Sequence, residues 1–163
     1  MYVMREELKL VYEIFDSSDA LNEEDKKLVN EARAITSNAY APYSNFFVGA
    51  AALLTNGQII KGSNQENASY PVGTCAERVL LGTAAVMYAG MPIKTMAISY
   101  DNKNGESNHP ISPCGMCRQA LKEFEDRTGN YMRLILTGKT GKVIILDKAV
   151  SLLPLSFGSA DLK

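Results

Sequence analysis

The apolar positions along the chain alternate between helical and extended spacing, which is typical of an α/β protein. Within residues 2–15 they recur every three or four positions and predict a short amphipathic helix, with Leu8, Val11, Tyr12 and Phe15 on one face. A better-defined helix is predicted to begin after Asn22. That residue is a favourable N-cap, and the acidic residues that follow it lie where the helix dipole favours negative charge. This helix must end before Pro42.

The middle of the chain predicts a hairpin followed by alternating helices and strands. Asn56-Gly57 is a strong hairpin signal between two apolar runs. The predicted elements are strands over 46–55 and 58–63, a helix over 76–89, a strand over 93–99, and a helix over 115–127.

Two short apolar runs, 132–136 and 143–146, close the series. The segment between them is too short for the crossover that parallel neighbours need, so we expect an antiparallel hairpin. The element order predicts a three-layer α/β/α fold around a mixed sheet of about five strands. We expect a single domain over 1–163, in which 1–21 form an N-terminal extension that carries the short helix.

Composition and charge narrow the range of possible functions. With 163 residues, 46% of them hydrophobic and 21% charged, the chain suits one globular domain. Its 17 basic and 18 acidic side chains nearly balance, which argues against a nucleic-acid partner. Charged residues interrupt the N-terminal apolar positions, and no apolar run is long enough to span a bilayer. We therefore expect a cytoplasmic protein without a membrane partner, in which thiols stay reduced.

The three cysteines lie in two phrases, T-C-A-E-R at 74–78 and S-P-C-G-M-C-R at 112–118. Both phrases fall at a predicted helix start, where free N–H groups and the helix dipole stabilise thiolates. Cys114 and Cys117 can bind one ion from a single turn, and Cys75 would add a third sulfur. Three thiolates on Zn²⁺ leave one tetrahedral position open, which is typical of a catalytic zinc site.

Two side chains beside Cys75 complete the predicted chemistry. Glu77 points away from the Cys75 direction, so its carboxylate is free to carry a proton for a water molecule at the open position. Three negative thiolates exceed the 2+ charge of zinc. Arg78 is expected to offset part of this excess negative charge from a position next to the ligands.

Other readings of the cysteines remain open at this point. His109 could close a structural Cys-Cys-Cys-His zinc site, which would make the protein a zinc-stabilised interaction module. Cys114 and Cys117 could also form a redox pair, although this leaves the Cys75–Glu77 phrase without a purpose. We expect His109 to be an exposed loop residue without a chemical role.

C-A-E followed by P-C-x-x-C resembles the three-cysteine signature of the zinc nucleoside and nucleobase deaminases. More specifically, the chain is similar to the small homotetrameric cytidine deaminases from about residue 30 to residue 158. The ordered segments that carry the resemblance are 41–46, 48–53, 62–70, 75–78, 112–119 and 152–158.

The resemblance implies a role for each matching residue. Cys75, Cys114 and Cys117 would bind one zinc per subunit, and Glu77 would be the proton shuttle. Of the remaining positions, Phe46 would pack on the pyrimidine, Asn64 and Glu66 would hold the ribose 3′-hydroxyl, and the backbone around Ala76 would address the base. Tyr70 would lie at the site entrance, and Phe157 would reach the site of a neighbouring subunit.

The implied reaction is hydrolytic deamination of cytidine and 2′-deoxycytidine to uridine and 2′-deoxyuridine, a step of pyrimidine salvage. It would be carried out by a homotetramer whose active sites are shared between subunits.

Three features of the sequence depart from the family pattern. Residues 1–21 extend the N-terminus beyond the usual start of the family's sequences, and we expect them to add a subunit contact. Residues 71–74 replace a more usual Gly-Leu-Thr-Asn run, and 79–85 also resemble the blasticidin-type deaminases, which stay as the alternative enzyme.

Overall fold

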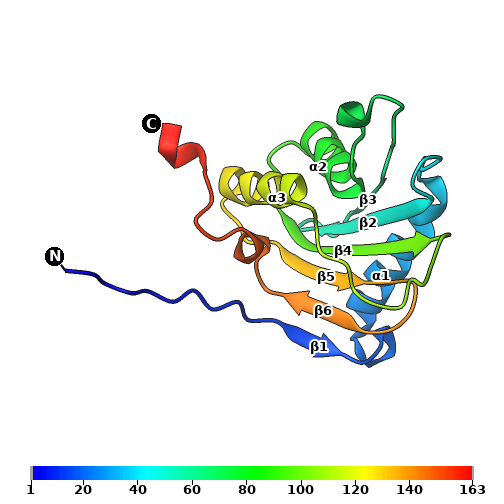
Figure 1. Ribbon diagram of the computed structural model, residues 1–163, viewed down its shortest axis with the longest axis horizontal. Coiled ribbons are helices and arrows are strands. Elements are labelled where there is room, and N and C mark those ends of the chain that lie inside the picture. The colour runs from blue at the N-terminus through cyan, green and yellow to red at the C-terminus, as the bar shows by residue number, and fades with distance from the viewer. Residues whose placement is uncertain (1, 163) are drawn as a thin grey trace.

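The computed structural model describes residues 2–162, which fold as a mixed sheet between two helical layers (Figure 1). The sheet has six strands in the order β1-β6-β5-β4-β2-β3. The strands are β1 (Glu13–Phe15), β2 (Phe46–Leu54), β3 (Ile59–Ser63), β4 (Ile93–Asn102), β5 (Arg133–Thr137) and β6 (Val143–Leu146). The helices are α1 (Glu23–Ile35), α2 (Ala76–Met87) and α3 (Gly115–Thr128). The expected three-layer α/β/α architecture is confirmed.

Alternation along the strands divides the core between the two faces of the sheet. Ala51 and Ala97 face α1, whereas their neighbours Ala50, Ala52 and Met96 face α2 and α3. Every one of these side chains is buried, because helices cover both faces. None of the helices within residues 2–162 combines the length and apolar character needed to cross a bilayer.

The pairing of strands follows the length of their connections. β4 and β5 are parallel, and α3 lies in the connection between them. β5 and β6 pair antiparallel, with Leu134 opposite Leu146, so the predicted closing hairpin is confirmed. The predicted Asn56-Gly57 hairpin is also present as the antiparallel β2–β3 pair, and Gly57 has a φ of 86° that suits glycine.

The predicted helix over residues 2–15 is wrong, and this segment also explains why the sheet has one strand more than expected. Residues 2–12 contain no helix, and Glu13–Phe15 form β1 on the open edge of β6. A short isolated helix is marginally stable in water, whereas the β6 edge offers unpaired backbone groups. Pairing there also lets Phe15 pack against the core beside α1.

A partly buried ion pair fixes the start of α1 to β5. Asn22 caps the helix, and Asp25 accepts from the Asn22 amide at 2.8 Å and from both Arg133 nitrogens at 2.7 and 2.9 Å. Asp25 is 2% exposed, so removal of its carboxylate leaves the Arg133 charge without a partner.

We expect Asp25→Ala to lower the free energy of unfolding by about 2–3 kcal/mol, measured by urea denaturation, because the Arg133 side chain left without its partner is partly solvated. Glu24→Ala is the matched control, since Glu24 pairs with Lys94 in solvent. That variant should lose less than about 1 kcal/mol. Equal losses in the two variants would show that the Asp25 pair contributes no more than a surface pair.

Candidate active site

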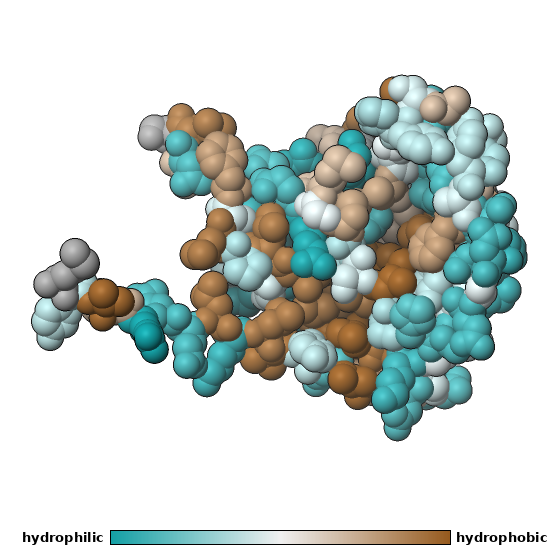
Figure 2. Space-filling model, in the orientation of Figure 1, coloured by the Kyte–Doolittle hydropathy of each residue, from teal (hydrophilic) through white to brown (hydrophobic). Residues whose placement is uncertain are grey.

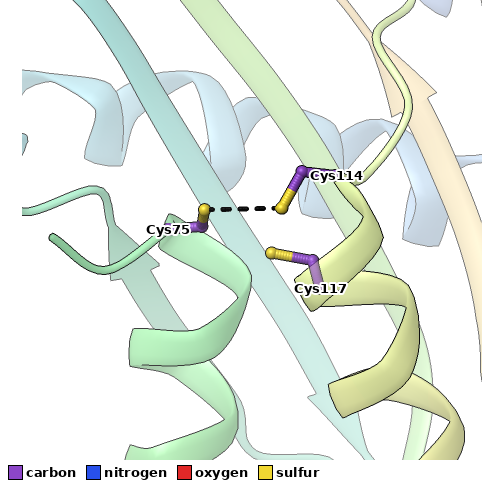
Figure 3. Close-up of side chains that lie close together, drawn as sticks. All are labelled: Cys75, Cys114 and Cys117. Atoms are coloured by element: carbon purple, nitrogen blue, oxygen red, sulfur yellow. Dashed lines mark hydrogen bonds between the residues drawn. The ribbon is translucent and has the colours of Figure 1, made fainter. Parts of the chain in front are cut away.

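The three cysteines meet where the N-terminal ends of α2 and α3 lie side by side (Figure 3). Their sulfur atoms all lie within 4.8 Å of one another, and the Cys75 and Cys114 Sγ atoms are 3.8 Å apart. Cys117 is buried and Cys114 is exposed, so the cluster opens to solvent on one side. Three clustered sulfur donors fit Zn²⁺ and leave room for a fourth, non-protein ligand.

Helix capping and close packing bring the thiols together. Cys75 is the N-cap residue of α2, and Cys114 is that of α3, so both thiols sit beside unpaired helix N–H groups. Gly62 of β3 lets α2 approach, because a Cβ there would lie 2.5 Å from the Ala76 carbonyl oxygen. Arg118 fixes the other helix start by donating to the carbonyls of Pro113 at 2.9 Å and Leu152 at 3.0 Å.

Hydrogen bonds among the thiols shift the pKa values of Cys75 and Cys117 in opposite directions. A hydrogen bond from the Cys117 thiol lowers the pKa of Cys75 to about 6, although burial works in the opposite direction. Cys114 and the positive charge of Arg78 add to this lowering. The same hydrogen bond, together with burial, raises the pKa of Cys117. The cluster thus already favours one thiolate, which is the form that binds a metal.

Glu77 lies in the first turn of α2 and is only 4% exposed. Burial raises the pKa of its carboxyl, and the negative charge on Cys75 raises it further. Among residues 2–162, the group of side chains placed to hold a metal consists of the three cysteines without Glu77. Glu77 is therefore a buried carboxyl next to the cluster, in a setting that favours proton exchange.

His109 lies outside the thiol cluster. Its ring is exposed, and Nδ1 is 3.1 Å from the hydroxyl of Tyr100. The cluster that the described residues form does not include it. The arrangement therefore favours an open three-sulfur site over a closed Cys-Cys-Cys-His site.

We expect His109→Ala to keep one zinc per chain and its thermal midpoint within a few degrees of the parent, because the ring contacts Tyr100 rather than the sulfurs. Metal analysis and thermal melting measure these two properties. If the variant lost zinc and unfolded, the closed structural site would be correct instead.

The side chains expected to contact a nucleoside form a second group around the start of β2. Phe46 stacks on Tyr100, with ring centroids 4.8 Å apart and planes 16° from parallel. Asn64 accepts from the Val48 N–H at 2.7 Å and donates to the Phe46 carbonyl at 2.9 Å. The Asn64 amide thus fixes the backbone that carries Phe46.

Glu66 binds the turn before β2. Its carboxylate accepts from the backbone N–H groups of Tyr43 and Ser44 and from the Ser44 hydroxyl. Burial opposes ionisation, but these hydrogen bonds hold the pKa of Glu66 below its ordinary value. Glu66 and Tyr70 also line a cavity of about 310 Å³, whose other walls are Tyr43, Ser44, Asn67 and Gly73. The cysteines are not among its lining residues.

Two expected residues take no part in these contacts. Ala76 is buried at the start of α2, where its carbonyl approaches β3. Phe157 is 59% exposed, and its carbonyl accepts from Gln119 of α3 at 3.1 Å. Sequence reasoning missed Tyr100, which joins Phe46 to His109. The alternation of Met96, Ile98 and Tyr100 along β4 could have placed it on the face that α2 and α3 cover.

Known proteins resemble this chain in sequence. The sequence pattern described as "Cytidine and deoxycytidylate deaminase zinc-binding region" matches residues 22–132. A cytidine deaminase of Sporosarcina psychrophila is 37% identical over 137 residues, which are 84% of this chain and 93% of that protein. A cytidine deaminase of Halalkalibacterium halodurans is 42% identical over 97 residues, which are 60% of this chain and 69% of that protein.

Solved structures agree in fold. The crystal structure of cytidine deaminase from Burkholderia pseudomallei superposes with a TM-score of 0.71 at 36% identity, over 84% of this chain and 100% of that one. That of cytidine deaminase from Mycobacterium tuberculosis has a TM-score of 0.64 at 27% identity, over 84% and 99% of the two chains. Because the matched pattern covers most of the chain and contains all three clustered cysteines, the chain belongs to the cytidine and deoxycytidylate deaminase family.

Proposed function

We propose that the protein hydrolyses cytidine and 2′-deoxycytidine to uridine and 2′-deoxyuridine, with release of ammonia. The observation that carries the proposal is the cluster of three thiols with a buried carboxyl, Glu77, beside it. Three sulfur donors fit a zinc site with one open position, and a neighbouring carboxyl that is not a ligand suits proton transfer. The cytidine deaminases to which the chain is similar support the choice of substrate.

Cys75, Cys114 and Cys117 would hold the zinc, which when bound acts as a Lewis acid that lowers the pKa of water. Glu77 takes a proton from the attacking water and delivers it to N3 of the pyrimidine, which makes C4 a better electrophile. After attack at C4, Glu77 takes the proton of the new C4 hydroxyl and delivers it to the 4-amino group, which leaves as ammonia while the C4–O bond becomes a carbonyl. Its raised pKa suits both directions of transfer, because the carboxyl holds a proton without becoming a strong acid. Arg78 offsets part of the negative charge of the sulfurs.

Residues around β2 would orient the nucleoside. Phe46 presents an aromatic face held by its stack on Tyr100, and such a face suits packing on a pyrimidine. Asn64 and Glu66 would bind the ribose 3′-hydroxyl through a lone pair that their own backbone contacts leave free. The backbone around Ala76 would meet the base edge beside Cys75.

The proposal extends to assembly and location. We expect four copies of the chain to share their active sites, with Phe157 reaching a neighbouring site and Tyr70 lying at the entrance. Both side chains are exposed in the single chain, by 59% and 76%, as residues that contact another subunit would be. A reducing compartment such as the cytoplasm suits a site that needs three free thiols.

An ultraviolet assay of zinc-loaded protein tests the substrate assignment. Cytidine, 2′-deoxycytidine, cytosine, adenosine and blasticidin S are each offered at the same concentration. We expect turnover of the first two alone, because the proposed contacts need both a ribose hydroxyl and a small pyrimidine. Preferential turnover of blasticidin S would favour the alternative enzyme, and turnover of none would overturn the proposal.

A further inference from the structure

The N-terminal arm, residues 2–12, has no role in the proposed chemistry. It lies outside the family's matched region and leaves the body as an extended strand-like segment (Figure 1). Its apolar side chains are open to solvent: Tyr2 is 100% exposed, Met4 80% and Leu8 71%. Burying such side chains is favourable, so an exposed series of them indicates a contact surface. Figure 2 shows further apolar side chains gathered where the arm joins the body.

β1 fixes the direction in which the arm leaves. Ile14 lies opposite Ile144 of β6, and Phe15 opposite Val143. Phe15 packs beside α1, so Ile14 faces the opposite side of the sheet. If the arm continues this alternation, its even-numbered positions share the Ile14 face. Those positions are Tyr2, Met4, Glu6, Leu8, Leu10 and Tyr12, all but one of them apolar.

Part of the arm borders an apolar groove of the same chain. Leu8, Lys9 and Leu10 form one side of a groove of about 360 Å³, and the other side consists of Val150, Ser151, Leu153, Pro154, Leu155 and Ser156. This second side is anchored to α3, because buried Glu125 accepts from the N–H groups of Ala149 and Val150 at 3.0 and 2.9 Å. Residues 2–4 do not line this groove, so they are free to meet another molecule.

We infer that the arms of two copies of this chain pair with each other as an antiparallel ribbon. In a symmetric antiparallel pair the twofold axis keeps each side chain on the same face, so partners must have the same parity. Centred on Glu6, this places Tyr2 opposite Leu10, Met4 opposite Leu8, and Arg5 opposite Glu7 of the second copy. Each arm therefore meets apolar side chains and opposite charges of the other copy, except at the axis, where the two Glu6 carboxylates lie opposite each other.

Charge favours this register over its neighbours, because it has two Arg5–Glu7 pairs against one Glu6–Glu6 contact, whereas the shifted registers have like-charge pairs and no opposite-charge pair. A pairing shifted one way places Arg5 opposite Arg5, and a pairing shifted the other way places Arg5 opposite Lys9. Like charges directly opposite one another in a ribbon are destabilising, whereas opposite charges and apolar pairs stabilise it. In the chosen register, Tyr2 and Met4 of one copy also reach the side of the groove formed by Leu8 and Leu10 of the other. The inference goes beyond deamination, and its test does not depend on activity.

A single cysteine at the twofold axis tests the inference directly. In Glu6→Cys, the two introduced thiols lie opposite each other with Cα atoms about 4.5–5.5 Å apart, within disulfide range. We expect zinc-loaded Glu6→Cys to form a covalent dimer with oxidised glutathione, seen on non-reducing gels and absent from the parent protein. Lys9→Cys is the matched control on the same exposed arm. Its two copies would be about 20 Å apart and should remain unlinked.

The outcomes separate cleanly. No dimer from Glu6→Cys, or equal amounts of dimer from both variants, would overturn the register and with it the inference.

Exchange of the paired charges tests the same register independently, with association measured by sedimentation. Arg5→Glu should weaken association about threefold to tenfold, since it sets two pairs of like charges opposite each other. Combining Arg5→Glu with Glu7→Arg should restore association, and failure to restore it would also contradict the pairing. Zinc content and deamination should stay unchanged throughout.

Discussion

Glu77→Gln is expected to lower kcat for cytidine by about 10²–10⁴-fold while the protein keeps one zinc per chain. Glutamine has nearly the shape of glutamate but cannot carry a proton between water and the pyrimidine. The buried position of Glu77 makes rescue by solvent inefficient, because the side chain is only 4% exposed. Steady-state kinetics by ultraviolet absorbance and metal analysis of the same preparation measure the two quantities.

Glu123→Gln is the matched control for this change. Glu123 lies on the exposed side of α3, so the same change from glutamate to glutamine can be made there. This variant should keep kcat within a factor of two of the parent. Activity of Glu77→Gln within tenfold of the parent would show that the carboxyl does not carry the proton. Loss of zinc together with activity would show instead that Glu77 supports the metal site.

The cysteine site was predictable because its determinants are local in the sequence. Helix starts after Cys75 and Cys114 can be recognised from capping and from the apolar period that follows, and a helix start favours thiolates. That both starts meet at one end of the sheet depends on topology, which the alternation of strands and helices predicts. The convergence of the three sulfurs within 4.8 Å agrees with this reasoning.

The N-terminal segment could not be predicted in the same way. The spacing of Leu8, Val11, Tyr12 and Phe15 fits a helix, and nothing local contradicts it. The deciding factor is the free edge of β6, which lies far along the chain and offers hydrogen bonds only after the sheet has formed. A short isolated helix is stabilised less than a strand that pairs with β6 and packs Phe15 against the core.

The residues expected to contact the nucleoside were only partly predictable from the sequence. Sequence pattern identifies Phe46, Asn64 and Glu66 as a set, and they do gather around the start of β2. It does not reveal that Glu66 binds the backbone before Phe46, or that Asn64 binds the Phe46 carbonyl and the backbone after it. Nor does it reveal the stack on Tyr100, which depends on β2 and β4 pairing with Val48 opposite Tyr100. Such contacts arise from strand register rather than from the type of residue.

Cys117→Ser is expected to reduce bound zinc from one per chain to less than a tenth after dialysis, and to abolish deamination. Serine has almost the same volume as cysteine, so packing at this fully buried position of α3 changes little. Its hydroxyl, however, stays protonated near neutral pH and binds zinc poorly, whereas a thiolate is a strong ligand. Metal analysis after dialysis and the ultraviolet assay give the two readings.

Stability separates loss of the metal from damage to the fold. A ligand that binds only the folded chain at 100 to 1,000 times its dissociation constant stabilises it by about 3–4 kcal/mol. Zinc should therefore raise the Tm of the chelator-treated parent protein and leave that of Cys117→Ser unchanged, while the two metal-free proteins melt at similar temperatures. A metal-free Cys117→Ser protein that melts far below the metal-free parent would show that the thiol stabilises the core by packing. Stoichiometric zinc in that variant would contradict a three-sulfur site, because the two remaining cysteines would then hold the ion without Cys117.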